Sequence, residues 1–399
     1  MFNSASAFNN GGSTSIGSWN TSSATTMFRM FNTASAFNQD IGSWDVSNVT
    51  TMGDMFNAAS AFNQDIGSWD VSNVGNLSSM FKSATAFNQD IGSWDVSGTS
   101  LFNNMFESAT SFNQDLSSWN TSSGTNMSYM FNNNTTFNNG GATGIGNWDV
   151  SNVTTFDFMF FNADSFNQPL LDWDCSSGSF FREMFRNNNG FGITNPKGEG
   201  TNPLNWTLNT IGTSNTIDMR GMFWSSWFNS DISGWDVSGI RDIERFAQAA
   251  RFNNGNTQGI YGDIDTWTWD NCFDFRVSFY ASQFNQPIGN WTFTTSRTIL
   301  ASDMFAFGRF NQDISNWDVS LFSNFQRTFR DSDFNQDLGP WGDHLYSSVA
   351  LANMLDNCDM STENYSRTLI GFANYVFDNS GPFNRSLGAA SLTYHGSTG

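Results

Sequence analysis

The chain has 399 residues, of which 16 are lysine or arginine and 36 are aspartate or glutamate, so its formal net charge is −20. A surface this acidic repels phosphate groups, which argues against nucleic acid or an anionic membrane as the partner. The chain also contains 42 Phe and 16 Trp, enough to build a core, whereas disordered acidic chains lack aromatic residues.

A unit of roughly 25 residues recurs along almost the whole chain. Residues 55–74 read MFNAASAFNQDIGSWDVSNV, and residues 80–96 read MFKSATAFNQDIGSWDV. Each of thirteen units has an anchor phenylalanine, at Phe8, Phe37, Phe62, Phe87, Phe112, Phe137, Phe166, Phe191, Phe228, Phe252, Phe284, Phe310 and Phe334. A tryptophan follows each anchor, at Trp19, Trp44, Trp69, Trp94, Trp119, Trp148, Trp173, Trp206, Trp235, Trp267, Trp291, Trp317 and Trp341. This self-similarity predicts a solenoid whose coils share one continuous core.

The first part of each unit carries apolar residues at helical spacing. In residues 49–62 these are Val49, Met52, Met55, Phe56, Ala59 and Phe62. Residues separated by three and four positions lie on one face of a helix. The spacing therefore predicts one or two helical turns in each unit.

The second part of each unit alternates between apolar and polar residues. Trp69, Asp70 and Val71 predict a short strand with Trp69 and Val71 inward, and Gly and Asn supply the turns. One helix and one strand per unit predict an α/β solenoid of the leucine-rich-repeat type with about 13 coils. Strands stack about 4.8 Å apart and helices about 10 Å apart, and this mismatch predicts curvature with the strands on the concave side.

The unit MFxxAxxFNQDIGSWDVSNVTxM resembles the repeat of BspA-type leucine-rich-repeat surface proteins over about residues 1–358. NYSRTLIGFANYVF, at 364–377, resembles the segment that closes such arrays. The pattern departs near Phe191, where FNQD becomes FGIT, and loosens from Arg241 onward. The resemblance implies adhesion or partner binding at a surface and brings no catalytic residue. We therefore predict a solenoid over 1–358 and a closing segment over 359–399 that leads into further chain.

Four insertions occur at the same point of the unit, between the anchor phenylalanine and the tryptophan. The spacing is seven residues in nine units, eleven at 9–19 and 138–148, and fifteen at 192–206 and 253–267. We expect these loops to line up along one edge. Insertions on one face often mark a binding surface, but a surface corner also tolerates added length at low cost. Both interpretations stay open.

The long loops of units eight and ten and two additional tryptophans supply the candidate binding residues. The sequence WSSW places Trp224 and Trp227 where sister units carry small residues, and exposed aromatic side chains often anchor recognition surfaces. The predicted binding residues are Asn195, Lys197, Glu199, Asn202, Trp224, Trp227, Asn256, Gln258, Tyr261 and Asp263.

Two columns of aspartates are expected from the repeat. One lies between the inward Trp and Val, at Asp45, Asp70, Asp95, Asp149, Asp174, Asp236 and Asp318. The other follows FNQ or its equivalent, at Asp40, Asp65, Asp90, Asp115, Asp231, Asp313 and Asp337. Stacked carboxylates need compensation, either from Ca²⁺ or from backbone N–H groups of their own turns. We prefer the second interpretation, and expect the Asn of each FN to form a buried ladder that bonds to the next coil's backbone.

The sequence offers few candidate catalytic or metal-binding residues. His344 and His395 lie beside no nucleophile motif. Cys175, Cys272 and Cys358 are too few and too far apart for a zinc site or disulfide framework, and Cys175 and Cys358 are expected to be buried. The chain has neither an apolar run long enough for a membrane span nor a recognisable signal peptide. We predict a non-enzyme without a cofactor, with Ca²⁺ left open.

These patterns predict a surface-exposed adhesion module that binds a glycan or protein receptor, without nucleic acid binding or membrane insertion. The expected location is extracellular, at a cell surface or virion surface. The alternative is a structural spacer or shell component of such an assembly. Whether the chain is part of a larger assembly or a longer chain stays open.

Overall fold

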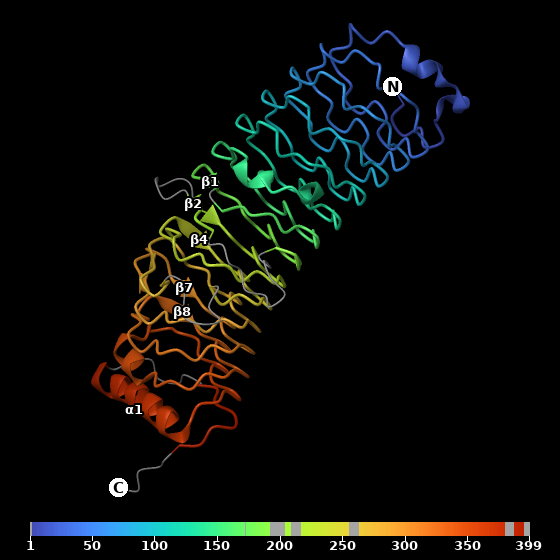
Figure 1. Cartoon of the computed structure of the whole chain (residues 1–399). Coiled ribbons are helices and arrows are strands. Elements are labelled where there is room, and N and C mark those ends of the chain that lie inside the picture. Colours follow the sequence, from blue (N-terminus) through green and yellow to red (C-terminus); the bar gives the residue numbers. More distant parts are fainter. Residues whose placement is uncertain are drawn as a thin grey trace. The chain divides into compact units, whose positions relative to one another are not determined.

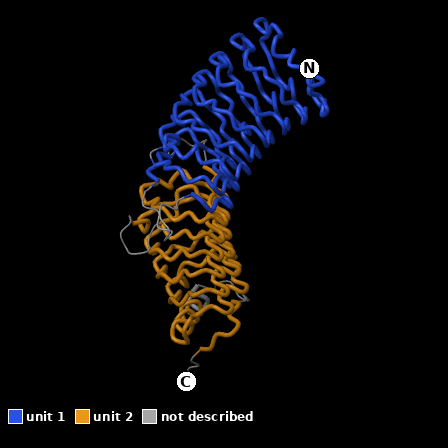
Figure 2. Tube along the Cα trace, turned by 45° about the vertical axis from the view of Figure 1, so that its right-hand side comes forward, with its two compact units in different colours: residues 1–194, 204–208 blue, residues 195–203, 209–399 orange. Residues whose placement is uncertain are grey.

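The structure is a computed structural model that describes residues 2–171, 173–191, 204–208, 217–254, 263–379 and 387–394. The chain divides into two compact units, which Figure 2 colours separately. Unit 1 contains residues 1–194 and 204–208, and unit 2 contains residues 195–203 and 209–399. Within each unit, successive coils lie side by side in chain order (Figure 1).

Regular elements are short in the described residues. The 3₁₀ helices are η1 (Asn10–Gly12), η2 (Thr14–Ser18), η3 (Asn139–Gly141), η4 (Gly144–Asn147) and η5 (Gly339–His344). The strands are β1 (Asp174–Cys175), β2 (Thr207–Leu208), β3 (Ile217–Asp218), β4 (Ile240–Asp242), β5 (Thr268–Trp269), β6 (Thr292–Phe293), β7 (Ile299–Leu300) and β8 (Phe322–Asn324). They form four parallel pairs, β1–β2, β3–β4, β5–β6 and β7–β8. The α-helix α1 spans Thr362–Asn379.

A backbone ladder joins successive coils between each Trp-Asp-Val and the next anchor phenylalanine. In unit 1, isolated parallel bridges link Thr26, Thr51, Asn76, Leu101, Asn126, Thr155 and Phe180 in turn. The N–H groups of Arg29, Phe31 and Thr33 donate to the carbonyls of Gly53, Met55 and Asn57 at 3.0, 2.9 and 2.6 Å. We call the outward surface of these segments the ladder face. It comprises residues 26–33, 51–58, 76–83, 101–108, 126–133, 155–162 and 180–187 in unit 1, and 218–225, 242–249, 274–281, 300–307, 324–331 and 350–357 in unit 2.

The prediction of a helix over residues 49–62 is wrong. The segment is a series of tight turns, in which the Met55 N–H donates to the Met52 carbonyl at 3.0 Å. Asp54 and Ala58 have left-handed φ angles of 56° and 57°, which an α-helix does not accommodate. Successive tight turns also point a residue inward every three or four positions, so the apolar spacing suits either structure.

The turns prevail because every second backbone N–H finds a carbonyl on the neighbouring coil. The fold is therefore a solenoid-like array of repeats with short parallel strand pairs, and it lacks the helix per coil of a leucine-rich repeat in the described residues. The predicted curvature assumed one helix in each coil, so it no longer follows from the spacing of the elements.

The predicted alternation at Trp-Asp-Val is confirmed. Trp69 and Val71 are buried and Asp70 is exposed. Strands β1, β2, β5 and β6 begin directly after Trp173, Trp206, Trp267 and Trp291. The predicted strand is thus formed in these coils, whereas residues 69–71 keep the alternation without a paired strand.

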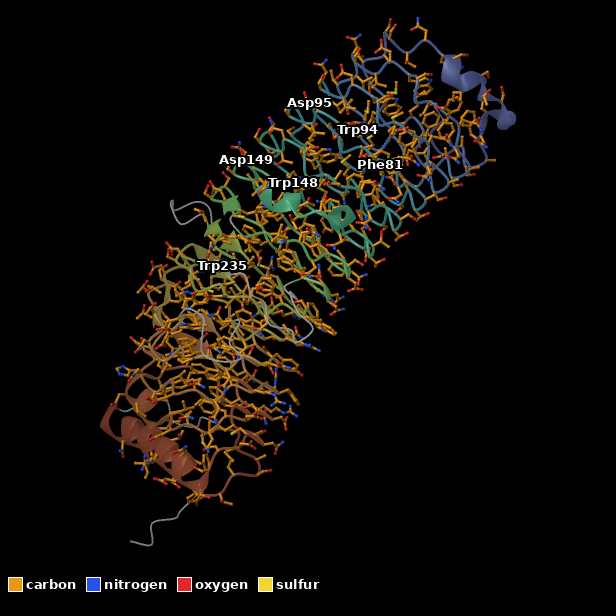
Figure 3. The ribbon with its side chains drawn as sticks, viewed as in Figure 1. Phe81, Trp94, Asp95, Trp148, Asp149 and Trp235 are labelled. Atoms are coloured by element: carbon orange, nitrogen blue, oxygen red, sulfur yellow. The ribbon has the colours of Figure 1, made fainter. Side chains whose placement is uncertain are left out.

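Stacked aromatic rings fill the core of unit 1. Phe56 stacks on Phe62 in its own coil, with centroids 3.8 Å apart, and on Phe81 in the next coil at 5.7 Å. Trp69 and Trp94 stack at 6.5 Å. Figure 3 shows Phe81 and Trp94 in the interior of the unit. The Trp69 Nε1–H donates to the Ile41 carbonyl at 3.2 Å, which satisfies the one polar atom that this buried side chain carries.

Helix α1 lies against η5 in unit 2 (Figure 1). The Leu338 N–H donates to the Thr368 hydroxyl at 2.9 Å, and Asn364 Nδ2 donates to the Asn335 carbonyl at 2.8 Å. Tyr365 and Phe372 are buried. The helix therefore covers polar backbone and apolar side chains of the coil before it. Across the described part of the chain, no helix combines the length and apolarity needed to cross a bilayer.

Candidate recognition surfaces

The aspartates between the inward Trp and Val cap their own turns. Asp45 Oδ1 accepts the Ser47 N–H at 3.1 Å and the Ser47 hydroxyl at 2.6 Å. Equivalent bonds from backbone N–H groups reach Asp70, Asp95, Asp149, Asp174, Asp236 and Asp318. Figure 3 shows Asp95 and Asp149 on the outside of unit 1. The serine hydroxyl, followed by the serine N–H, lowers the pKa of Asp45, Asp95 and Asp149.

The aspartates after FNQ have the same role. Asp65 Oδ1 accepts the Gly67 N–H at 2.9 Å, and Asp40, Asp90, Asp115, Asp231, Asp313 and Asp337 accept the N–H two residues ahead. Gly67 is required for close stacking, because a Cβ at this position would lie 2.7 Å from the Asp90 carbonyl oxygen. The predicted hydrogen bonds from the aspartates' own turns are thus present in both columns.

The hydrogen bonds of the predicted asparagine ladder are confirmed, but its burial is not, because Asn38 and Asn88 are exposed. Asn38 Oδ1 accepts the Asn63 N–H of the next coil at 3.0 Å. The Gln64 amide donates to the same oxygen at 2.9 Å, so the glutamine of FNQ strengthens the ladder. Equivalent N–H bonds recur at Asn88, Asn113, Asn138, Asn253, Asn285, Asn311 and Asn335.

Metal-binding groups are not assembled in the described segments: no three His, Cys, Asp or Glu side chains gather in a way that could hold an ion. Cys175 and Cys358 are buried as predicted, and Cys272 is buried too. Burial raises the pKa of all three thiols, in Cys358 to about 11. The absence of a cofactor, with Ca²⁺ left open, stays a prediction.

The inserted loops are tied to the coil before them where they are described. In the loop at 138–148, the buried Asn139 accepts the Leu116 N–H at 2.7 Å and donates to the Ala142 carbonyl at 2.8 Å. Asn254, also buried, accepts the Ile232 N–H at 2.9 Å in unit 2. The second asparagine of these two loops thus has a structural role.

Three of the ten predicted binding residues are described. Trp227 is 41 % exposed, and the Arg251 guanidinium lies 3.9 Å from the centre of its ring. Trp224 is half-buried on the ladder face, with the Arg245 guanidinium 5.3 Å from its ring centre. Asp263 is exposed and accepts the Asp265 N–H at 2.7 Å. Asn195, Lys197, Glu199, Asn202, Asn256, Gln258 and Tyr261 lie outside the described residues.

An aromatic cluster occupies three successive coils of the ladder face in unit 1. We call it the aromatic shelf, and it consists of Tyr129, Phe158, Phe161, Phe180, Arg182 and Arg186. Tyr129 and Phe158 stack with centroids 4.7 Å apart and planes at 12°, and Phe161 lies 5.8 Å from Phe158 at 54°. Phe180 is 42 % exposed, and the other three rings are half-buried.

Two arginines border these rings. The Arg182 guanidinium lies 5.3 Å from the Phe180 ring centre, and the Arg186 guanidinium lies 5.4 Å from that of Phe161. Arg182 Nε also donates to the buried Asp157 at 2.9 Å, and Arg186 pairs with Glu183 at 2.7 Å. Both cations are therefore held in place by carboxylates as well as by rings.

Five stretches of the chain match the family described as "Mycoplasma protein of unknown function, DUF285". They span residues 1–82, 64–143, 119–199, 198–260 and 255–368, and so cover 1–368 without a break. The chain belongs to the DUF285 family. The tandem matches are consistent with a BspA-type repeat protein. Comparison with curated proteins and with solved structures gave no match.

The DUF285 repeat leaves the aromatic shelf unexplained, and sequence reasoning missed it. Sister units carry Asp54, Ser79 and Asn104 at the position of Tyr129 and Phe158. A search for aromatic residues at positions that are polar in other units would have found the cluster.

Proposed function

We propose that this DUF285 chain is a surface-exposed recognition module that binds a glycan or protein receptor and performs no catalysis. The main support is Trp227, which is 41 % exposed at a position where other units carry Ala36, Ala61 and Ala86. An exposed tryptophan contributes little to a core, whereas tryptophan and arginine are enriched among residues that dominate binding energy. We place the module outside the cell, on a cell or virion surface.

The neighbouring arginine strengthens this proposal. The guanidinium of Arg251, which belongs to the next coil, lies 3.9 Å from the centre of the Trp227 ring. The two side chains therefore hold each other in a defined arrangement. A cation over an indole ring contributes about 0.5–1 kcal/mol at an exposed site. Part of the ordering cost of binding is thus met before a ligand arrives.

The alternative function is a structural spacer. Many outward polar groups bond to their own solenoid, as when Asn73 Nδ2 donates to the Ser47 carbonyl at 2.8 Å. Side chains already used in this way offer few free groups to a ligand, and a stiff array of such coils suits a scaffold.

Binding by a Trp224→Ala/Trp227→Ala variant separates the two functions. The purified chain and the variant would be tested on a glycan array and on receptor-bearing cells. Removal of an anchor should weaken binding at least about tenfold, while Phe28→Ala, at an exposed phenylalanine in unit 1, should leave it unchanged. Equal binding by the variant would exclude the tryptophans as anchors. Failure of the unaltered chain to bind either target would favour the spacer.

A further inference from the structure

We propose that the aromatic shelf of unit 1 is a docking site for a protein partner that has an apolar centre and a basic rim. This inference rests on the proposed function, since it assumes a recognition module. It names the class of partner and adds a surface distinct from Trp224 and Trp227.

Folding alone does not account for the rings. Tyr129 and Phe158 have φ angles of 59° and 56°, in the left-handed region where Asn and Asp are enriched and bulky side chains are uncommon. The sister residue Asn104 has nearly the same φ, 60°. Other coils fill the position with Arg29, Arg245 and Val277 at φ angles of 57°, 60° and 60°, so its backbone admits large side chains but does not require a ring. Both rings remain half-buried on the surface, so they add less core than a buried phenylalanine.

The arrangement of the rings favours a protein over a glycan. Tyr129 and Phe158 cover each other's faces at 4.7 Å, and a guanidinium lies by Phe161 and another by Phe180. A sugar ring stacks on an open aromatic face, which this packing restricts. Phe180 remains 42 % exposed, and edge-to-face contacts with another protein's aromatic side chains are favourable. Tyrosine, phenylalanine and arginine together also match the composition of protein interfaces.

The negative charge around the shelf determines which residues the partner carries around its apolar centre. The two shelf arginines pair with Asp157 and Glu183, so the shelf itself carries little net charge. Residues 1–181 contain fourteen acidic and two basic residues, a balance of −12. Such a field attracts a basic partner and repels an acidic one. The partner should therefore place apolar side chains on the shelf and lysine or arginine around it.

The test uses a random peptide library displayed on phage and selected on the immobilised full chain. The matched variant is Tyr129→Asn/Phe158→Asn/Phe161→Asn, which introduces residues present at these positions in sister units (Asn104 and Asn57). Its melting temperature should remain close to that of the unaltered chain. The Trp224→Ala/Trp227→Ala variant serves as the control for the other surface.

We expect selected peptides to combine aromatic or aliphatic residues with lysine or arginine. Titration calorimetry of the most enriched synthetic peptide should show at least about tenfold weaker binding to the shelf variant. Binding to the tryptophan variant should be unchanged. Added salt should weaken peptide binding to the unaltered chain and to both variants. A glycan array should give the same pattern for the unaltered chain and the shelf variant.

Several results would overturn the inference. These are no enrichment, enriched peptides without basic residues, or equal binding to the shelf variant. Loss of glycan binding in the shelf variant would assign the shelf to a glycan, and loss of self-association in sedimentation would assign it to a second copy of the chain. Glycan or receptor binding that persists through Trp224 and Trp227 would preserve the proposed function while the shelf inference fails. Absence of all binding by the unaltered chain would reject both.

Discussion

A buried repeat tryptophan such as Trp94 fills the core and also donates a hydrogen bond to the coil before it. In the regular coils of unit 1, the Trp94 Nε1–H donates to the Ile66 carbonyl at 3.1 Å, as Trp69 does to Ile41. The adjacent aspartate contributes only to its own exposed turn. Trp69 and the adjacent Asp70 should therefore differ strongly in how much they stabilise the fold.

Replacement of Trp69 by Ala should lower the free energy of unfolding by about 3–5 kcal/mol, the range for a buried tryptophan. Asp70→Ala removes a turn cap at the surface and should cost about 0.5–1 kcal/mol. Urea denaturation of both variants measures the difference. Equal losses would show that the assignment of inward and outward positions is mistaken.

The hydrogen-bond series is interrupted in unit 2. Among the described residues, the buried Nε1 atoms of Trp267 and Trp269 have no hydrogen-bond partner, whereas Trp291 Nε1 donates to the Ile264 carbonyl at 2.8 Å. Trp291→Phe leaves that carbonyl without its donor, which costs about 1–3 kcal/mol. Trp267→Phe loses a similar ring volume but no bond, so it should destabilise the chain by less. Denaturant midpoints of the two variants provide the comparison, and equal values would indicate that the Trp267 N–H is satisfied in solution.

At the scale of elements, α1 and η5 approach most closely at two glycines. A Cβ on Gly371 would lie 2.1 Å from the Gly339 carbonyl oxygen. Gly→Ala within a helix normally stabilises it by about 1 kcal/mol. We expect Gly371→Ala to reverse that sign, because the helix must shift away from η5. The neighbouring Ile370, 60 % exposed, gives the control Ile370→Ala. A higher melting temperature for Gly371→Ala would show that the two elements do not pack this closely.

A second element-scale feature is the carboxylate column on the ladder face of unit 2. Asp242 is paired along the ladder with Asp218 and Asp274. Burial raises the pKa of Asp242 to about 6, and Asp274 and Asp218 add to the rise. The Glu244 N–H, at 2.9 Å, and Arg220, at 3.6 Å, oppose it.

The sign of the pH effect follows from this raised pKa. The charged form is disfavoured in the fold, so the penalty is present above about pH 6 and is relieved as pH falls toward the unfolded value near 4. Asp242→Asn should therefore stabilise the chain at pH 7.5, by on the order of 1–2 kcal/mol, and have little effect at pH 4.5. Denaturant melts across this range test it. A constant difference between variant and parent would contradict the titration.

The capping aspartates have the opposite dependence. The pKa of Asp45, Asp95 and Asp149 is lowered, so their contribution is present above about pH 4 and is lost below it. The stability gained when Asp242 is protonated, below about pH 6, and the stability lost when the caps are protonated, below about pH 4, therefore belong to different pH ranges.

How much of this fold could be predicted depends on whether an interaction is local. The caps at Asp45 and Asp65 follow from residues two positions apart, and the inward Trp69 follows from alternation. The turns over residues 49–62 could not be distinguished from a helix, because they depend on carbonyls in the next coil. The aromatic shelf could have been predicted, because Tyr129 and Phe158 stand where sister units carry Asp54 and Ser79. Seven of the ten predicted binding residues lie outside the described residues.

For the whole molecule, the dominant electrostatic quantity is the net charge of −20. Self-repulsion of this kind destabilises a compact state. The capping carboxylates gain hydrogen bonds but keep their charge, and most face solvent. Dissolved salt can therefore screen them, over a distance of about 8 Å at physiological ionic strength.

Screening and specific calcium binding predict different responses of the melting temperature. We expect a rise when NaCl increases from about 10 mM to about 150 mM, because exposed like charges are screened. A chelator at constant ionic strength should change it little, because backbone and serine groups already compensate the carboxylates, as at Asp45 and Ser47. A fall of more than about 10 °C that CaCl₂ restores and MgCl₂ does not would imply several kcal/mol of metal linkage. That result would overturn the turn-capping explanation as a full account of the aspartate columns and assign them a calcium site.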